Sequence, residues 1–427
     1  MERARTTNPE RRVHARRHRP LAALLGLGLL AGGGTALALT TSAGATVTPT
    51  TTAVSPAALG SNWYASAPYL MPEDNNPPNA AAVMDATGQK AFQLAFILDG
   101  GGCSPAWGGT SSINTDTTMP SVISTIRAKG GDVSVSFGGY GGTKLGQTCG
   151  TPEATAAAYQ KAVDKYQLKA VDFDLEEPEY ENTAAIHNEI GAARLLQQNN
   201  PGLYVSITTA GTNAGTGWFG TQMLNEAKSQ GFTPANYSIM PFDGGFNGAA
   251  AQTDALVKFN AILQSTFGWS EATAYAHEGV SMMNGRTDAA EYFRQADFQT
   301  VLDFATAHGL ARYTYWSVNR DRQCAGTVDP GLSGSCSSVV QNDWDFTKYT
   351  VRFAGATPPT TPPSSSPSPS PTTPGTCTAP AWDPTKVYTA GNVVSYAGHK
   401  WHAKWWTQNE NPSASGQWGV WADDGPC

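Results

Sequence analysis

Lys169-Ala-Val-Asp-Phe-Asp-Leu-Glu176 places three carboxylates at strict two-residue spacing in a segment with the composition of a buried β-strand. Side chains alternate between the two faces of a strand, so Asp172, Asp174 and Glu176 share one face and the apolar residues between them share the other. An apolar face of this kind is covered by helices in parallel sheets. The acidic face therefore points toward an enclosed space or a cleft.

Three acids on one face of a strand lie close enough to affect one another's ionisation. Successive acids are roughly 6.6 Å apart along the strand, and in a partly dry site at least one of them retains its proton at neutral pH. A retained proton is what a general acid needs. The alternative interpretation is an edge strand with a solvated acidic face.

The acidic segment is one of eight apolar runs of strand length that alternate with helical patterns. The expected strands cover 62–66, 91–98, 132–137, 170–176, 203–208, 237–242, 279–283 and 312–318, and helices are expected at 117–129, 152–167, 183–199, 250–266 and 287–308. Eight such units in about 290 residues predict an α/β fold, the (β/α)8 or TIM barrel, whose catalytic groups lie at the carboxyl ends of the strands. Pro178 ends the acidic strand, so Glu176 is expected at its open end, which disfavours the edge-strand alternative.

The beginning of the chain has the layout of a secretory signal. Residues 1–45 contain seven arginines, all before residue 20, then a short apolar run at 21–30 and a small-residue end. Pairs such as Arg11-Arg12 leave twin-arginine export open beside the general route. The run is too short to predict a membrane span. We therefore expect a secreted, extracellular protein with no membrane anchor in its mature form.

Low-complexity segments divide the rest of the chain. Thr, Pro and Ala dominate 46–60, which is expected to be a flexible leader, and Pro, Ser and Thr dominate 355–376, which is expected to be a semi-stiff linker. The barrel is accordingly expected at 61–354 and a small module at 377–427.

The net charge of the chain indicates which kinds of binding partner are compatible with its surface. The chain carries −7 in total, and removal of the signal with its net +5 leaves −12. So acidic a surface argues against nucleic acid or an anionic membrane as the partner and suits a neutral substrate. We expect a monomer.

Six cysteines fit export into an oxidising compartment. Fifteen pairings are open in principle, and the spacing matches no zinc-binding pattern. Cys377 and Cys427 bracket the last module, and Cys324 and Cys336 bracket a Gly/Ser-rich loop. We expect these two pairs and, by elimination, a bond between Cys103 and Cys149.

Metal and nucleotide chemistry find no support in the motifs. The seven histidines show no metal-binding spacing on any one element, and Gly138-Gly-Tyr-Gly-Gly142 lacks the Lys and Ser/Thr that complete a phosphate-binding loop. No metal and no cofactor are expected.

Four motifs in order along the barrel resemble glycoside hydrolase family 18, the chitinases and their relatives. Asp172-Phe-Asp-Leu-Glu176 resembles the DxxDxDxE signature, Ser136-Phe-Gly-Gly139 the SxGG motif, and Met240-Pro-Phe-Asp243 the MxYD motif. Trp316 stands on the last strand, where the family has an aromatic floor. Gly138 and Gly139 permit close approach of the backbone.

The resemblance implies a substrate-assisted mechanism, in which the 2-acetamido oxygen of the sugar attacks the anomeric carbon. Glu176 is then the general acid and base, Asp174 holds the acetamido N–H, and Asp172 shares a proton with Asp174. Ser136 is expected to support this pair, and Met240 and Asp243 to contact the sugar above Trp316.

Two positions depart from the family pattern. Lys169 replaces the first aspartate of the signature at the expected buried beginning of the strand, where we expect a structural consequence alone. Phe242 replaces the tyrosine of MxYD and removes a hydroxyl that positions the acetamido group in the family. Tyr315 is the candidate replacement for that hydroxyl.

The last module contains six tryptophans in about fifty residues. Its Ala403-Lys-Trp-Trp-Thr-Gln408 stretch resembles carbohydrate-binding modules of family 5/12. Trp405 and Trp406 are the binding candidates, since on a strand one of two adjacent rings would face outward. Core packing is expected for Trp382, and for Trp418 and Trp421 it remains an alternative to binding.

The combined resemblance predicts a chitinase that cleaves β-1,4 bonds between N-acetylglucosamine units of chitin and chito-oligosaccharides. Two alternatives stay open: an endo-β-N-acetylglucosaminidase acting on glycans, and a non-catalytic chitin-binding protein, which the loss of the tyrosine hydroxyl at Phe242 motivates.

Overall fold

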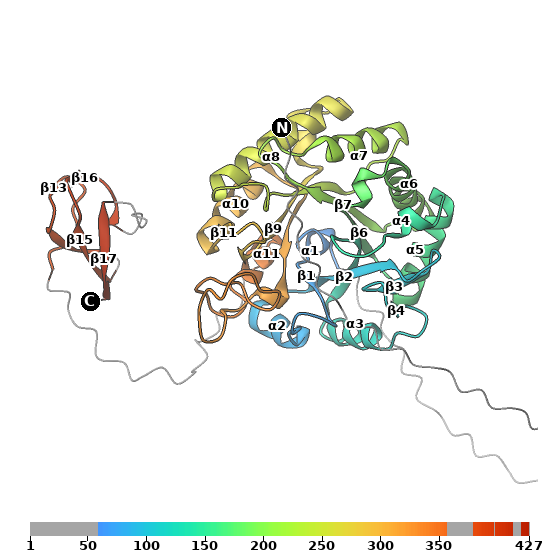
Figure 1. Ribbon diagram of the computed structural model, residues 1–427, viewed down its shortest axis with the longest axis horizontal. Helices are drawn as coiled ribbons and strands as arrows, with labels where there is room; N and C mark the ends of the chain where they lie inside the picture. The colour runs from blue at the N-terminus through green and yellow to red at the C-terminus, as the bar shows by residue number, and fades with distance from the viewer. Residues whose placement is uncertain (1–58, 357–378, 397, 413–419, 427) are drawn as a thin grey trace, which may run out of the picture. The chain divides into compact units, whose positions relative to one another are not determined.

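The computed structural model describes residues 59–356, 379–396, 398–412 and 420–426 (Figure 1). The predicted signal at 1–45, most of the leader and linker, and the expected bond between Cys377 and Cys427 lie outside the described residues.

Eight parallel strands form a barrel, and helices surround it (Figure 1). The strands are β1 (Tyr69–Leu70), β2 (Ala91–Asp99), β5 (Asp132–Gly138), β6 (Ala170–Leu175), β7 (Tyr204–Ala210), β8 (Asn236–Met240), β9 (Glu278–Met283) and β12 (Arg312–Trp316). The ring closes next to β1, where Tyr313 N of β12 donates to Ala65 O, in the segment that precedes β1, at 3.0 Å. The predicted (β/α)8 barrel is confirmed.

Amphipathic helices cover the outer face of the strands. The longer ones are α2 (Ala80–Thr87), α3 (Thr118–Ala128), α5 (Pro152–Tyr166), α6 (Thr183–Asn199), α7 (Trp218–Ser229), α8 (Ala249–Phe267), α10 (Gln295–His308) and α11 (Thr347–Phe353). Helix α5 illustrates the local signals, since Thr151 caps its first turn, Pro152 opens it and Gln167 ends it in a left-handed conformation. No helix in the described part of the chain is long and apolar enough to cross a membrane.

Two sequence expectations about these elements were wrong. Residues 62–66 do not form the first strand: Ser61–Tyr64 is a helical turn, α1, and the strand lies at β1. Trp63 and Tyr64 are apolar because they pack at the amino-terminal end of the barrel against Ala91 and Ala170. The helix expected from residue 287 begins at Gln295, because the short hairpin of β10 (Gly285–Arg286) and β11 (Tyr292–Phe293) occupies the preceding residues.

The two faces of the barrel strands differ in chemistry. Outward side chains such as Val171, Phe173 and Val280 join one continuous apolar core with the helices. Inward positions are largely polar, and most are buried: Gln93, Ser134, Ser136, Asp172, Asp174, Ser206, Thr208, Asn236, Ser238, Ser281, Arg312 and Thr314. An interior of this kind requires a closed hydrogen-bond network rather than apolar layers.

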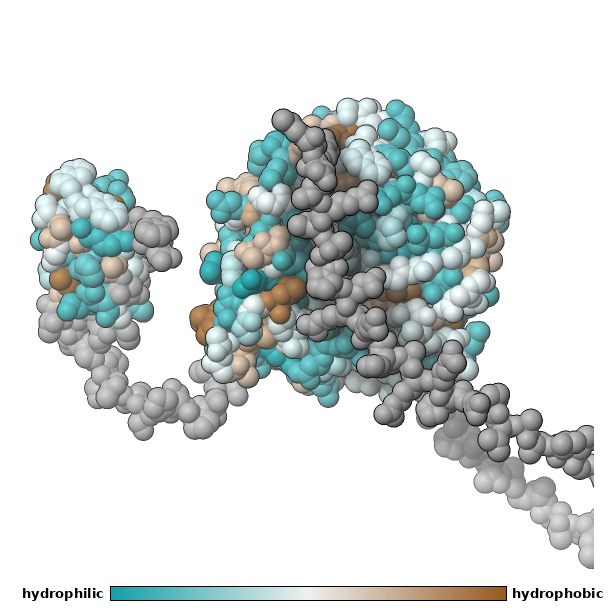
Figure 2. Space-filling model, viewed as in Figure 1, coloured by the Kyte–Doolittle hydropathy of each residue, from teal (hydrophilic) through white to brown (hydrophobic). Residues whose placement is uncertain are grey.

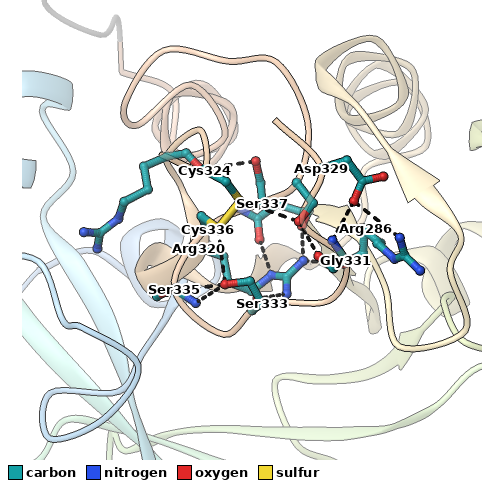
Figure 3. Close-up of a disulfide and its surroundings, with 12 residues drawn as sticks. Arg286, Arg320, Cys324, Asp329, Gly331, Ser333, Ser335, Cys336 and Ser337 are labelled. Atoms are coloured by element: carbon teal, nitrogen blue, oxygen red, sulfur yellow. Dashed lines mark hydrogen bonds and ion pairs between the residues drawn. A yellow bond between two sulfur atoms is a disulfide. The ribbon is translucent and has the colours of Figure 1, made fainter. Parts of the chain in front are cut away.

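Two disulfides brace loops at the carboxyl ends of the strands. Cys103 pairs with Cys149, and Cys324 pairs with Cys336, so both predicted bonds are confirmed. Figure 3 shows the second bond beside the Arg320 side chain, whose guanidinium lies among the backbone of the same loop and of the β10 strand. Its Nη2 donates to Asn284 O at 2.8 Å, so this buried arginine ties the loop after β12 to the one after β9.

The described residues of the C-terminal module form two small β-sheets. One pairs β13 (Val387–Tyr388) with β16 (Thr407–Gln408), and the other orders β14 (Val393–Tyr396), β15 (His399–Ala403) and β17 (Trp421–Pro426). Its core comprises Tyr388, Val394, Trp401, Ala403, Val420 and Trp421. On the faces visible in Figure 2, hydrophobic residues are scattered among hydrophilic ones, as on surfaces exposed to water.

Candidate active site

Strand β6 lies between β5 and β7 in the barrel wall, so the edge-strand interpretation is wrong. Asp172 and Asp174 point inward and are buried, while Phe173 points outward and contacts Phe137 and Tyr159. Glu176 follows the last residue of the strand and is half-buried at its open end. The two-residue spacing therefore produces the single acidic face that the sequence predicted.

One oxygen of Asp172 faces a cation. Arg312 Nη1 lies 3.1 Å from Asp172 Oδ1, and both side chains are fully buried. The same oxygen accepts hydrogen bonds from Ser206 Oγ at 2.6 Å and Thr208 Oγ1 at 2.9 Å. Burial of a carboxylate is tolerated when it is paired and hydrogen-bonded in this way.

The other oxygen of Asp172 accepts three hydrogen bonds from three different strands. Tyr69 Oη and Gln93 Nε2 each donate at 3.0 Å, and Ser136 Oγ donates at 2.8 Å. Both oxygens of the carboxylate are thus occupied by hydrogen-bond donors, and the sharing of a proton with Asp174 that the resemblance implied stays a prediction. The role of Asp172 in this structure is to anchor the interior network.

Asp174 has a different environment, although it lies two residues away on the same strand. Burial raises the pKa of Asp174 well above its usual range, and the charges of Glu176 and Asp172 raise it further, while Arg312 opposes the shift. Its Oδ1 is buried without a hydrogen-bond partner among the described residues. The protonated form of Asp174 is therefore favoured, and one of its oxygens is free for a ligand.

Gly138 and Gly139 allow the end of β5 to lie against the acidic strand. Gly138 has φ +107°, and a Cβ there would stand 2.1 Å from Asp174 O; at Gly139, with φ +88°, it would meet the Phe96 ring. The Gly139 amide donates to Asp174 O at 2.9 Å. Both glycines are thus required by close backbone approach, and they lie under the site rather than against a ligand.

Glu176 has the acidity of a general acid at neutral pH. Burial raises the pKa of this carboxyl to about 7, the positive charge of Lys144 opposes the shift, and the charges of Glu177, Asp243 and Asp288 add to it. A group that titrates near 7 can both donate and accept a proton during turnover.

The acids open into a cavity of about 580 Å³ at the carboxyl end of the barrel. It is lined by Tyr69, Phe96, Tyr140, Asp174, Glu176, Met240, Phe242, Asp243, Ser281, Met283, Asp288, Ala289 and Trp316. Trp316 stacks on Phe96 with ring centroids 5.5 Å apart and planes 9° from parallel. Tyr69 packs edge-on against Trp316 and at a tilt against Phe96. The cavity thus has an aromatic side next to the acidic one, which suits a sugar ring.

The structure brings Met240, Asp243 and Trp316 to this cavity with the acids, as the motifs predicted. Asp243 stands at the mouth with φ +55°, where its Oδ1 accepts a hydrogen bond from Ala289 N at 2.7 Å. Phe242 also lines the cavity, so the hydroxyl missing from the MxYD motif is missing at the site itself.

Tyr315 does not reach the cavity, and its proposed role as the replacement hydroxyl is wrong. It lies next to Trp316 on β12 and therefore faces the opposite way, into the layer between barrel and helices. Its hydroxyl is within 2.9 Å of Asp321 Oδ2 and 2.8 Å of Thr347 Oγ1. Lys169 differs too: it is exposed at the start of the strand rather than buried.

Several residues of the site were not predicted from the sequence. Tyr69, Phe96, Ser281 and Asp288 line the cavity, and Arg312 and Lys144 lie behind the acids. A lone arginine opening the last strand, on the face shared with Trp316, was a usable signal for the first of these two cations. Ser281 Oγ, at the wall of the cavity, has no hydrogen-bond partner among the described residues and is available to a ligand.

The C-terminal module presents its adjacent tryptophans together. Trp405 is 48% and Trp406 61% exposed, and both lie in the bend between β15 and β16 rather than on a strand. Both rings are therefore exposed, whereas the sequence predicted that one of the two would face outward. Trp421 is core, Trp382 is partly buried against Tyr396, and Trp418 lies outside the described residues.

The C-terminal module matches a known family of carbohydrate-binding modules. Residues 381–422 match the model of carbohydrate-binding module family 5/12. The C-terminal module belongs to this family.

The barrel is similar to chitinases. The chain is 27% identical over 289 residues to the probable bifunctional chitinase/lysozyme of Escherichia coli, covering 63% of this chain and 32% of that protein. It is 26% identical over 280 residues to endochitinase 11 of Metarhizium anisopliae, covering 61% and 53%. The chain thus spans between a third and about half of the length of these relatives.

A solved structure has the same fold. The catalytic domain of the hyperthermophilic chitinase from Pyrococcus furiosus superposes with a TM-score of 0.61 at 24% identity, covering 68% of this chain and 94% of that one. Together, these comparisons confirm the resemblance to chitinases that the barrel motifs indicated.

Proposed function

We propose that this protein is a secreted chitinase that hydrolyses β-1,4-linked N-acetylglucosamine polymers with retention of configuration. The observation that carries the proposal is the pair formed by Glu176, whose pKa of about 7 suits proton transfer, and the neighbouring Asp174, whose pKa is raised and which has an unpaired oxygen. Both line one cavity with the aromatic face of Trp316. The names of the barrel's relatives and the family of the last module support the choice of substrate.

The first step breaks the glycosidic bond. The acetamido oxygen of the bound sugar bonds to the anomeric carbon as the bond to the leaving oxygen breaks, and Glu176 gives its proton to that oxygen. Asp174 accepts a hydrogen bond from the acetamido N–H through its free oxygen, which orients the nucleophile. The sugar stacks on Trp316, so its ring is held beside both acids.

The second step opens the cyclic intermediate. Glu176, now a carboxylate, takes a proton from water, and the water oxygen bonds to the anomeric carbon while the acetamido oxygen leaves it. Two inversions at one carbon give net retention. Asp172 does not line the cavity, and the hydrogen bonds that it accepts fix the strand that carries both acids.

Export accounts for the remaining features of the chain. Two disulfides among the described residues are stable in an oxidising compartment, and the arginine-rich apolar beginning has the layout of a signal. The exposed pair Trp405 and Trp406 would then hold the enzyme on insoluble chitin.

The test is release of soluble oligosaccharides from colloidal chitin by the native chain and by Glu176→Gln. We expect release by the native chain and a loss on the order of 100-fold or more in the variant, whose amide cannot donate the acidic proton. Equal release would exclude Glu176 as the acid. No release by either, with chitin binding retained, would favour the non-catalytic binding protein, and release from glycoproteins alone would favour the endo-β-N-acetylglucosaminidase.

A further inference from the structure

A buried lysine is hydrogen-bonded to the backbone of the residue that follows the proposed general acid. Lys144 precedes the short helix α4 (Leu145–Thr148) in the loop after β5 and is 1% exposed. Its Nζ donates to Tyr140 O at 3.1 Å, Gly142 O at 3.4 Å and Glu177 O at 3.0 Å. Three acceptors match the three donors of an ammonium, whereas a neutral amine has two, so the geometry is that of the charged form.

These three bonds connect two active-site loops. Two of the acceptor carbonyls belong to the loop after β5, and the third belongs to Glu177, the residue that follows Glu176. Within the described residues, no carboxylate oxygen lies within 4.0 Å of Lys144 Nζ, so its charge is not consumed by a direct ion pair. The charge of the Lys144 ammonium interacts through space with nearby acids, among them Glu176 and Glu179.

Two of those acids form a buried pair on the far side of the lysine. Glu179 and Glu189 are 0% and 1% exposed. Glu189 Oε1 accepts hydrogen bonds from Gly146 N and Tyr159 Oη, both at 2.6 Å. Burial raises the pKa of Glu179 well above its usual range, and the charge of Glu189 raises it further.

Several carboxyls act together on the Lys144 ammonium. Burial lowers the pKa of Lys144, and the charges of Glu179, Glu176, Asp174 and Glu189 oppose that shift. Burial is in turn the main cause that raises the pKa of each of these four carboxyls. A cation among so many acids of raised pKa favours the ionised form of those nearest to it.

We propose that Lys144 is a positioning residue for Glu176: its ammonium joins the loops after β5 and β6 and supplies the positive charge that keeps this carboxyl able to ionise during turnover. The inference rests on the proposed role of Glu176 as acid and base. Without the lysine, Glu176 would face Asp174 on its own strand and Glu177, Asp243 and Asp288 from the surrounding loops without the ammonium that opposes their effect on its pKa. It would then hold its proton too firmly to act as a base in the second step.

The test is a direct titration of Glu176, which does not depend on turnover. Glutamate labelled with 13C at the side-chain carboxyl is followed by NMR against pH in the full chain, and the Glu176 signal is assigned by its loss in Glu176→Gln. We expect a midpoint near 7 in the native chain, a rise of about one unit in Lys144→Met, and a midpoint within a few tenths of the native one in Lys144→Arg. Lys161→Met, an exposed lysine of α5, is the control and leaves the midpoint unchanged.

A second readout separates positioning from simple support of the fold. The alkaline limb of kcat/KM on soluble chito-oligosaccharides moves up in pH with the Glu176 midpoint in Lys144→Met, and kcat at pH 7 falls about tenfold, whereas Lys144→Arg restores both. Lys144→Gln, which keeps an N–H donor without the charge, replaces the methionine variant if that one does not fold.

An unchanged Glu176 midpoint in a folded, uncharged variant would overturn the proposal, as would a fall in rate that is equal at every pH. A midpoint that shifts in a chain without chitinase activity would leave the role of Lys144 standing and refute the proposed function instead.

Discussion

Arg312 Nη1 lies 3.1 Å from Asp172 Oδ1, with both side chains completely removed from solvent at the centre of the barrel. The arginine opens the last barrel strand and the aspartate stands in the middle of the fourth, so this ion pair spans the interior. Arg312 also donates to Thr208 Oγ1 at 2.7 Å and to Gln93 Oε1 at 2.9 Å. The pair therefore connects four strands through hydrogen bonds of charged groups.

Arg312→Met is expected to destabilise the barrel by about 3–5 kcal/mol, because it leaves the buried Asp172 carboxylate without its cation. Denaturant unfolding of the variant and the native chain measures the loss. Ser206→Ala removes one hydrogen bond from the same oxygen and is expected to cost about 1 kcal/mol. If the arginine variant lost no more than the serine variant, the ion pair would not be what holds the interior together.

Activity is expected to fall as the pH rises through about 7. Glu176 must be protonated in the free enzyme to donate to the leaving oxygen, and its pKa is raised to about 7 mainly by burial. The alkaline limb of kcat/KM on soluble chito-oligosaccharides should therefore lie near that value. A limb at pH 5, where an ordinary glutamate would place it, would contradict the assignment.

The same carboxyl is expected to reduce folding stability above its unfolded pKa. Between the unfolded pKa of about 4.5 and the folded pKa of about 7, the folded chain keeps this proton while the unfolded chain has released it. The free energy of unfolding therefore falls as the pH rises through this range. Glu176→Gln should match the native stability at pH 4 and exceed it by about 1–3 kcal/mol at pH 8. Unfolding curves at the two pH values measure this difference, and a constant offset would refute it.

Trp316 and Tyr315 are neighbours on β12 that should respond differently to substitution. Trp316→Ala removes an aromatic wall of the cavity and is expected to lower kcat/KM on soluble oligomers at least tenfold. Tyr315→Phe breaks contacts with Asp321 and Thr347 outside the barrel, which should cost about 1 kcal/mol of stability and leave kcat/KM nearly unchanged. Steady-state kinetics and thermal unfolding on both variants separate the two effects. Equal kinetic losses would mean that Tyr315 serves the site.

The C-terminal module should affect solid substrate alone. Changing Trp405 and Trp406 together to Ala removes two exposed rings without touching the core of the module. We expect at least a tenfold loss of binding to insoluble chitin, slower release from it, and unchanged hydrolysis of short soluble oligomers. Loss of both activities would show that these tryptophans have another role.

The sequence by itself determined the properties that depend on local periodicity. Two-residue alternation placed Asp172 and Asp174 on one face of a strand, and alternation of strands and helices gave the barrel. The same reasoning failed at 62–66, where Trp63 and Tyr64 are apolar because they cover the end of the barrel. A buried helical turn and a buried strand can have the same apolar and aromatic composition, so composition does not distinguish them.

Tertiary structure alone decided the electrostatics of the site. Tyr69 reaches Asp172 across 103 residues of sequence, and Arg312 and Lys144 arrive from other strands and loops, so no local pattern links them to the acids. Their arrival fills the oxygens of Asp172, and the charges of Arg312 and Lys144 oppose the rise that burial causes in the pKa of Asp174 and of Glu176. Ionisation depends on burial and on charges a few ångströms away in space, and the closure of the barrel, not the order of residues, sets those distances.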